Sequence, residues 1–398
     1  MSIVTTFRKY GMMLSTLYIR HCDKAQIVKI INTCDFKRIN NVYPRAIRNI
    51  YFYVGALHSF SGGITSILRL GSILSEMGRK IFYIVEESMD IKIARRNAQF
   101  NLNGYKGCVI SLNEYHDMQP STDDVIIATS AFSVYKVIKM KGYKMYFVQD
   151  YEPYFSDEFE LSLLARKTYD MGLHIISLGT WNRDIINGNI QSEAKIDCID
   201  FPYEKKEYSV VERDYISYQY KRRLNIAVYL KETSKRLPVI IPEILKSVSC
   251  MFQKDGIELN FTFYGGIRTL SKSMGTNLGK IPKEQLMDLY SKSDFGMVAS
   301  MTNISLVPYE MLATGLPLIE FEDGSFPHFF TKDCALLTSY SPEDLYNKIK
   351  MCLADPSIFL ERNRNAQEEL GKLSWEKSAN QFNRILSEIE GTEINEKC

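Results

Sequence analysis

Short apolar runs alternate with amphipathic stretches along most of the 398-residue chain. The first clear run is residues 49–57, and the turn-forming segment 58–63 follows it. Apolar residues at helical spacing come next and end at Gly78, before another apolar run at 80–88. Apolar runs of this length predict buried parallel strands, and the spacing between them predicts a connecting helix. The segment is therefore expected to form a right-handed strand–helix–strand unit.

The same alternation continues through two halves of the chain. Further strands are predicted in the first half at 108–112, 124–130, 144–150, 174–179 and 195–202. After a charged, aromatic stretch, the pattern restarts with predicted strands at 224–230, 259–266, 294–300, 316–321 and 334–338. Strands that alternate with helices in this way predict two separate α/β domains, each with a doubly wound parallel sheet.

The predicted domain limits follow from this rhythm. We expect a first domain over residues 1–215, in which 1–47 form a helical extension of one or two helices. A second domain is expected over 216–372, with helices in its last part at 342–354 and 356–370. The final segment, 373–398, is expected to form a long helix that crosses back to the first domain.

Composition narrows the classes of protein that fit. The chain is 45% hydrophobic and 24% charged, with a net charge of +2, which favours a globular protein and gives no reason to expect a nucleic-acid partner. The eight cysteines are scattered without metal-ligand spacing, which favours a reduced cytoplasm. Because no apolar run approaches the ~20 residues of a membrane span and basic residues interrupt the first 24, we expect a cytoplasmic protein. Contact with the inner membrane face would be peripheral, and the basic cluster 221–223 suits either a solvated linker or anionic lipid headgroups.

Gly62 and Gly63 stand between a predicted strand end and a helix. A glycine pair here lets the backbone approach a ligand, and the helix N-terminus can hold an anion. A tight turn would need the same residues. The segment is not a G-x-G-x-x-G motif, which argues against a dinucleotide-dependent enzyme.

A second candidate lies at the start of the second domain. Lys231 follows a predicted strand, and Arg236 stands five residues later at the start of a helix, a pair of cations that suits a diphosphate. Ordinary surface charge is the alternative, and Lys235 leaves open which cation matters.

A third candidate is the segment 300–320. A polar loop leaves a predicted strand here, and Glu310 lies early in the helix that follows. A carboxylate at this place can accept hydrogen bonds from two ribose hydroxyls while loop amides face phosphate. Alternatively, Glu310 only favours the helix dipole.

The order of these three elements along the chain resembles the retaining GT-B glycosyltransferases of glycosyltransferase family 4, from about residue 49 to the C-terminal helix. The phrases YFVQDYEPYFS, YLKETSKRLP and NISLVPYEMLATGLPLIE are similar to those of bacterial rhamnan-type and S-layer-glycan rhamnosyltransferases. The resemblance implies a GT-B fold, with two Rossmann-like domains facing across a cleft. It also implies transfer of L-rhamnose from dTDP-L-rhamnose to a growing cell-surface glycan.

The resemblance also implies roles for particular residues. Lys231 and Arg236 match the pair that binds the donor diphosphate, with the two identities swapped, and Glu310 matches the glutamate that holds the ribose. Thr302 stands where the family has another glutamate, beside the donor sugar, and this is a departure from the pattern. The other residues expected to bind the donor are Gly62, Gly63, Gly265, Gly266, Ile281, Asn303, Ile304 and Ser305.

Asp150 completes the set of candidate residues. It follows the predicted strand 144–150 and is expected to orient the acceptor or take the proton from its hydroxyl. A capping role is the alternative for Asp150. Glu152 fits either reading equally, and His58 and His328 stay outside the first choices.

Transfer of a sugar to a glycan or lipid-linked saccharide is thus the expected function. No cofactor or metal ion is expected, since no D-x-D pair is present. Two alternatives remain. Because Thr302 replaces a glutamate, the chain could be a non-catalytic GT-B partner of another glycosyltransferase, and a sugar-nucleotide epimerase is the third possibility.

Overall fold

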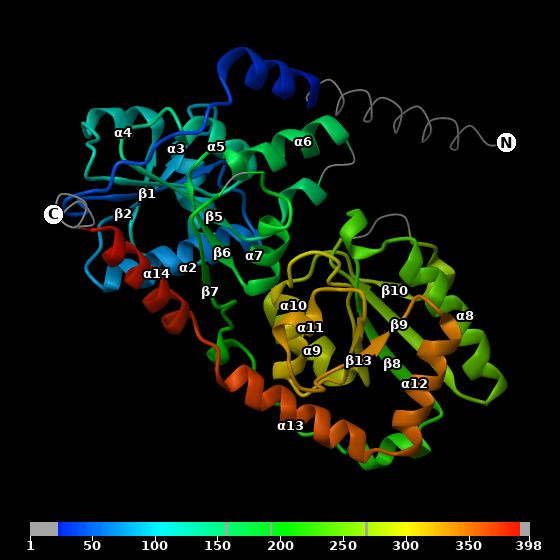
Figure 1. The fold of residues 1–398 in the computed structure, drawn as a ribbon. Coiled ribbons are helices and arrows are strands. Elements are labelled where there is room, and N and C mark those ends of the chain that lie inside the picture. The colour runs from blue at the N-terminus through cyan, green and yellow to red at the C-terminus, as the bar shows by residue number, and fades with distance from the viewer. Residues whose placement is uncertain (1–22, 156–157, 192, 267–269, 391–398) are drawn as a thin grey trace.

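The computed structural model describes residues 23–155, 158–191, 193–266 and 270–390. Within these residues the strands form two sheets, one of seven strands and one of six (Figure 1). The strand orders are β3-β2-β1-β4-β5-β6-β7 and β10-β9-β8-β11-β12-β13, and the paired strands run parallel. In each sheet the order reverses next to the first strand, between β1 and β4 and between β8 and β11. Ligands of doubly wound folds bind at such points, beyond the carboxyl ends of the strands.

The first sheet and its helices come from residues before 200. Its strands are β1 (Ile50–Gly55), β2 (Ile81–Val85), β3 (Cys108–Ser111), β4 (Val125–Ala128), β5 (Tyr143–Val148), β6 (His174–Leu178) and β7 (Ile196–Ile199). The helices are α2 (Gly62–Glu76), α3 (Ile91–Asn101), α4 (Leu112–Asp117), α5 (Ala131–Val137), α6 (Phe159–Lys167) and α7 (Thr180–Asn187), preceded by a helix over 23–33.

Alternation along β1 explains why both faces of this sheet are covered. Ile50 and Phe52 point into the core that α2 and the C-terminal helix complete. Tyr51 and Tyr53 point to the opposite face, where they join the core that includes Ile30 of the N-terminal helix. All four strand residues are almost fully buried, as expected for a parallel strand with helices on both sides.

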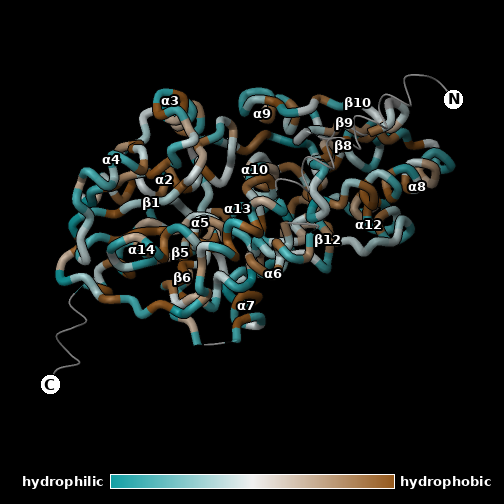
Figure 2. The backbone as a smooth tube through the Cα atoms, turned by 90° about the horizontal axis from the view of Figure 1, so that it is seen from above, coloured by the Kyte–Doolittle hydropathy of each residue, from teal (hydrophilic) through white to brown (hydrophobic). Residues whose placement is uncertain are grey.

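The second sheet repeats this arrangement. Its strands are β8 (Arg223–Tyr229), β9 (Glu258–Tyr264), β10 (Thr276–Asn277), β11 (Phe295–Met297), β12 (Leu318–Phe321) and β13 (Leu336–Thr338). The helices are α8 (Ile240–Lys254), α9 (Lys283–Lys292), α10 (Leu306–Ala313), α11 (Phe326–Phe329), α12 (Pro342–Ala354) and α13 (Ser357–Gly371). Hydrophobic stretches of the backbone concentrate inside both domains, and hydrophilic stretches lie along the outer helices and loops (Figure 2).

The chain passes between the two domains twice. Residues after β7 lead to the second domain, where the Tyr215 hydroxyl donates to the Gly315 carbonyl at 2.5 Å. Helix α14 (Trp375–Ile389) returns and packs on α2 and β7 (Figure 1). The Phe382 ring of α14 lies 6.5 Å from that of Phe52 and 6.2 Å from that of Phe147, between ring centres.

The twelve strands predicted from the sequence are present, and the order of the sheets agrees with two doubly wound domains. The two-residue strand β10 was not predicted, because it is too short to show a pattern. The helical extension is observed over 23–33, and the part of the prediction that concerns residues 1–22 lies outside the described residues. No helix in the described ranges is long and apolar enough to cross a membrane.

Candidate functional site

Asp150, two residues beyond the end of β5, lies where the two domains meet. Its carboxylate accepts hydrogen bonds from three groups of the second domain. The Thr302 hydroxyl donates at 2.9 Å, the backbone N–H of Asn303 at 2.9 Å and the Lys235 ammonium at 2.8 Å. Both donor segments follow strands of the second sheet: residues 298–305, called here the junction loop, follow β11, and Lys235 lies beyond β8. The carboxyl ends of the two sheets thus meet at one carboxylate.

Asn303 fixes the junction loop to the first domain. Its side-chain amide donates to the carbonyls of Gln149 and Leu178, both at 2.7 Å. The side chain is 1% exposed, and its Oδ1 finds no hydrogen-bond partner within the described residues. A buried acceptor without a partner costs free energy unless another group donates to it. Asn303 therefore holds the domains together, and its unpaired Oδ1 lies against Gly179, 3.6 Å from the place that an added Cβ would take.

The glycine turn of the first domain lies beside the same place. The Gln149 side-chain amide donates to the Gly63 carbonyl at 3.2 Å. A methyl group added at Gly63 would lie 3.5 Å from that amide, whereas one added at Gly62 would meet nothing within 4 Å. There is thus open space beside Gly62, and the glycine pair lies next to the Asp150 segment, while its role toward a donor stays a prediction.

The two cations predicted to bind diphosphate share one aromatic ring. The Lys231 Nζ lies 5.4 Å from the centre of the Tyr229 ring, and the Arg236 guanidinium lies 5.7 Å from it. Arg236 is 5% exposed and donates to the Ala299 carbonyl at 2.5 Å, so this hydrogen bond holds the start of the junction loop in place. Lys231 is exposed. Their role toward a diphosphate stays a prediction.

Lys235 is the cation that contacts Asp150, and the sequence did not single it out. Its Nζ also lies 3.7 Å from the centre of the Phe155 ring, which is a close cation–π contact. The side chains of Lys235 and Asp150 are 20% and 14% exposed, respectively. Burial lowers the pKa of Lys235, and the Asp150 carboxylate opposes that shift.

Glu320 supports the junction loop from inside the second domain. Its buried carboxyl accepts hydrogen bonds from the Ser300 hydroxyl at 2.6 Å and the Ser300 backbone N–H at 3.1 Å. Burial raises the pKa of Glu320 to about 7, while Ser300 and the charge of Arg236 act in the opposite direction. The only sequence feature that marks Glu320 is a charged residue inside an otherwise apolar strand.

Glu310 of α10 lies in a cluster of tyrosine hydroxyls. Burial raises its pKa to about 7, and hydrogen bonds from Tyr208 and Tyr290 lower it, as does the charge of Lys283. The Tyr290 hydroxyl is itself 2.7 Å from that of Tyr264. Tyr208 belongs to the stretch that crosses between the domains, so a hydroxyl from that stretch lies close to the carboxyl group predicted to bind ribose.

Ion pairs beside Glu310 also join the domains. Arg69 of α2 pairs with Glu204 at 3.1 Å and with Glu207, and Glu207 pairs in turn with Lys283 of α9. These ion pairs could not be predicted from the sequence, because Arg69 and Lys283 are far along the chain from the two glutamates.

The remaining predicted donor residues lie around the same loops. Gly265 has a φ of +108°, and an added Cβ would lie 2.8 Å from both the Leu230 carbonyl and the Tyr229 ring, so only glycine fits. Its N–H donates to the Gly279 carbonyl at 2.8 Å, which ties this turn to the loop that carries Ile281. A Cβ added at Gly266 would lie 3.4 Å from the Lys280 side chain. Ile304 is buried, and the buried hydroxyl of Ser305 has no hydrogen-bond partner among the described residues.

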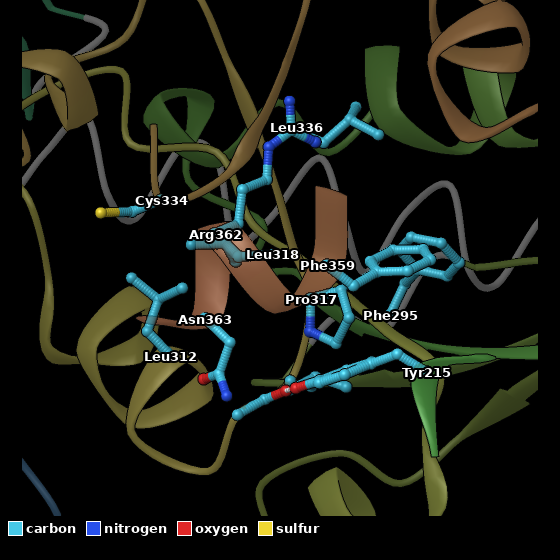
Figure 3. Close-up of a pocket in the computed structure, with 12 residues that line it drawn as sticks. Tyr215, Phe295, Leu312, Pro317, Leu318, Cys334, Leu336, Phe359, Arg362 and Asn363 are labelled. Carbon is cyan, nitrogen blue, oxygen red and sulfur yellow. Dashed lines mark hydrogen bonds between the residues drawn. The ribbon is translucent and has the colours of Figure 1, made fainter. Parts of the chain in front are cut away.

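A small cavity lies elsewhere in the second domain, between β11, β12 and α13. Figure 3 shows the rings of Tyr215, Phe295 and Phe359 together with Pro317 and Arg362 around it. Its volume is about 20 Å³, which is enough for roughly one water molecule. A cavity of this size cannot hold a sugar nucleotide.

No group of three or more His, Cys, Asp or Glu side chains in the described part of the chain could hold a metal ion. Around the Asp150 carboxylate, the second domain contributes a cation, a hydroxyl and a backbone amide, which suit an anionic ligand.

Comparison with solved structures identifies the architecture. Sucrose-phosphate synthase from Thermosynechococcus elongatus superposes with a TM-score of 0.63 at 15% identity, over 86% of this chain and 99% of that one. S. aureus TarM, in a complex with UDP, superposes with a TM-score of 0.64 at 10% identity, over 85% of this chain and all of that one. Anabaena HepE in complex with UDP-glucose gives 0.65 at 13% identity, over 85% and 99%. The chain has the GT-B fold.

Sequence comparison finds a relative of higher identity that is much longer than this chain. The chain is 23% identical over 358 residues to the O-antigen biosynthesis protein RfbC of Myxococcus xanthus. The match covers 82% of this chain. It spans about a quarter (26%) of the length of that protein. No protein-family model matches the chain.

Proposed function

We propose that this protein is a glycosyltransferase that moves a sugar from a nucleoside diphosphate to a cell-surface glycan. The observation that carries the proposal is the meeting of Asp150 with Lys235, Thr302 and Asn303 at the carboxyl ends of both sheets. The GT-B neighbours TarM and HepE are described in complexes with UDP or UDP-glucose, and RfbC is named for O-antigen biosynthesis. Donor nucleotide and glycan acceptor are therefore the partners that fit the junction best.

The chemistry of the transfer assigns roles to both domains. The bond between the sugar C1 and the diphosphate oxygen breaks, and a bond from C1 to the acceptor oxygen forms. Negative charge grows on the leaving diphosphate, which Lys231 and Arg236 would stabilise together with amides of the junction loop. Asp150 would orient the acceptor hydroxyl and receive its proton. These residues supply the stabilisation without a metal ion, which is part of the proposal.

For the sugar we propose L-rhamnose from dTDP-L-rhamnose, transferred with retention at C1, on the resemblance of the Asp150 and Lys231 segments to rhamnosyltransferases. UDP-sugars are the competing donors, because the solved neighbours bind UDP. The test is to incubate the protein with dTDP-, UDP- and GDP-sugars and rhamnosylated acceptors, and to measure the nucleoside diphosphate released. NMR of the product gives the configuration at C1. Absence of turnover with every donor would contradict the proposal.

A non-catalytic GT-B partner is the second candidate, and Thr302 is the observation that favours it. In the structure the Thr302 hydroxyl donates to Asp150 rather than presenting a carboxylate of its own. A partner subunit would bind no donor and would tolerate Lys231→Ala, whereas an enzyme would lose donor affinity. An epimerase would convert the nucleotide sugar in the absence of acceptor, which the same NMR experiment detects.

We also propose that the outer face of the first domain touches anionic membrane, where a lipid-linked acceptor would be found. Val28 and Ile31 of the helix 23–33 are 46% and 55% exposed, and Phe159 of α6 is 73% exposed. Lysines lie on the same helix, and α5 packs against both elements, with the Tyr135 hydroxyl donating to a backbone carbonyl of α6 at 2.8 Å. Exposed apolar side chains with neighbouring lysines suit a surface of acidic headgroups.

Sedimentation with vesicles tests this surface. The protein should bind phosphatidylglycerol vesicles and not phosphatidylcholine vesicles, and V28S/I31S should weaken the binding. A matched change on the opposite domain, V239S at an exposed valine, should leave it unchanged. Equal binding of V28S/I31S and the unmodified protein would contradict the proposed surface.

A further inference from the structure

Three hydrogen-bond donors of the second domain converge on one point at the junction. They are the ammonium of Lys235, the hydroxyl of Thr302 and the backbone N–H of Asn303, at 2.8, 2.9 and 2.9 Å from the carboxylate of Asp150. An ammonium, a hydroxyl and a backbone N–H aimed together are the groups that proteins use to hold a phosphate. Here a side chain of the other domain accepts all three.

We propose that Lys235, Thr302 and Asn303 form a phosphate subsite for the nucleoside diphosphate, in which the Asp150 carboxylate stands in for the phosphate when none is bound. The inference rests on the proposed function and extends it. It assigns Lys235 to the ligand and makes Asp150 a competitor of that ligand in the free protein.

The charges around Lys235 support this reading. Arg236 and Lys231 both lie close enough to lower its pKa, in addition to the larger effect of burial. Three cations thus gather at the junction, and Arg236 acts in turn on the buried carboxyl of Glu320. The buried carboxyls of Glu152 and Glu320 also face Lys235 and Arg236, but burial raises the pKa of each to about 7 and so limits the negative charge that they supply. A diphosphate would therefore offset more of the positive charge than Asp150 does.

The contacts of Lys235 also explain why an anion is needed at this point at all times. Its side chain is largely covered, and the Phe155 ring lies against the ammonium at 3.7 Å from the ring centre. A buried ammonium without an anionic partner is costly, so the lysine cannot give up Asp150 unless another anion replaces it. Exchange of carboxylate for phosphate keeps the ammonium paired throughout.

Asn303 offers a second, independent sign of a ligand. Its Oδ1 is buried and unpaired in the described structure, although its amide hydrogens are bonded to two carbonyls of the first domain. The junction loop therefore has both anion-binding donors and a free acceptor.

The proposal predicts opposite effects for two partners of one ion pair. Asp150→Asn removes the internal anion and should tighten the binding of dTDP or UDP. Lys235→Met removes the cation that phosphate needs and should weaken binding by about tenfold, the effect of one charge-assisted hydrogen bond. Thr302→Val, which removes only a hydroxyl, should weaken binding by a smaller factor, about threefold.

The experiment is titration calorimetry with dTDP and UDP on the full chain. The matched controls are D288N on α9, where Asp288 pairs with Lys292 on the surface, and K246M at an exposed lysine of α8. Tighter binding by D150N with weaker binding by K235M and T302V supports the subsite. Weaker binding by D150N, or unchanged binding by K235M, overturns it.

Thermal unfolding of each variant checks that the fold is kept. If D150N does not fold, K235M and T302V still decide, because each must weaken nucleotide binding. Failure of the unmodified protein to bind any nucleoside diphosphate would overturn the proposed function and the subsite together. Normal affinity in all three variants would overturn the subsite alone.

Discussion

The carboxylate of Asp150 lies 2.9 Å from the hydroxyl of Thr302, although the two residues are 152 positions apart in the sequence. The sequence resemblance leads us to expect a glutamate at the position of Thr302, and the structure shows a carboxylate from the other domain beside it. The negative charge at this place is therefore supplied by the first domain.

Thr302→Glu should accordingly be harmful rather than restorative. Two carboxylates would then compete for the one ammonium of Lys235, and we expect a loss of about 2 kcal/mol or more in stability. Chemical unfolding and turnover measure the effect. D150N/T302E should recover most of the loss, and T33E at an exposed threonine should cause little. Higher activity of T302E than of the unmodified protein would contradict this view.

Asn303→Ala should loosen the junction. The carbonyls of Gln149 and Leu178 would each lose a buried hydrogen bond, and each loss costs about 1–3 kcal/mol. Urea unfolding should show the loss. As a control, N365A removes an exposed side-chain hydrogen bond and should cost about 0.5 kcal/mol or less. Equal effects of the two substitutions would mean that the Asn303 contacts do not stabilise the junction.

The buried carboxyl of Glu320 should make stability depend on pH. Its pKa is raised from the ordinary 4.5 to about 7 by burial, so the folded protein binds the proton more tightly than the unfolded chain. Stability then falls as the pH rises from about 4.5 to about 7, with a slope of up to ~1.4 kcal/mol per pH unit for one proton. Glu320→Gln should reduce this slope, and E343Q at an exposed glutamate should not. Unfolding in urea at pH 5, 6, 7 and 8 measures the slope in both variants. Equal slopes in E320Q and the unmodified protein would contradict the role of Glu320 in the pH dependence.

Glu310 and Tyr208 should differ in their effect on nucleotide binding. If Glu310 holds the ribose, Glu310→Gln should weaken dTDP binding by about tenfold. Tyr208→Phe removes a hydroxyl that bonds to Glu310, and a ribose hydroxyl can replace it, so affinity should stay within about threefold. Titration calorimetry compares the two. A larger loss for Y208F than for E310Q would indicate that Tyr208 itself contacts the nucleotide.

The strands and helices could be predicted because buried parallel strands form continuous apolar runs, as in residues 124–130, and because α2 and α14 show clear helical spacing. The choice among Lys231, Lys235 and Arg236 could not be made in the same way. Spacing along a loop does not determine which side chain becomes buried, and only the fold shows that Lys235 contacts Asp150 while Arg236 turns under the junction loop.

The contacts made by the stretch that crosses between the domains could not be predicted from the sequence either. Tyr208 lies in a charged, aromatic stretch with no periodicity, and its contact with Glu310 depends on how the two domains pack. Glu320 could have been noticed as a charge within an apolar strand, but its partner Ser300 is identified only by the pairing of β11 with β12.

The two passages of the chain between the domains lie against each other. The Ser378 hydroxyl of the returning helix donates to the Asp200 carbonyl at 2.9 Å, and Lys205 donates to the Gly371 carbonyl at 2.8 Å. Two neighbouring covalent connections restrict relative sliding of the domains and leave mainly rotation about the line on which both connections lie. Under the proposed function, the energy of ligand binding at the junction would act along that rotation.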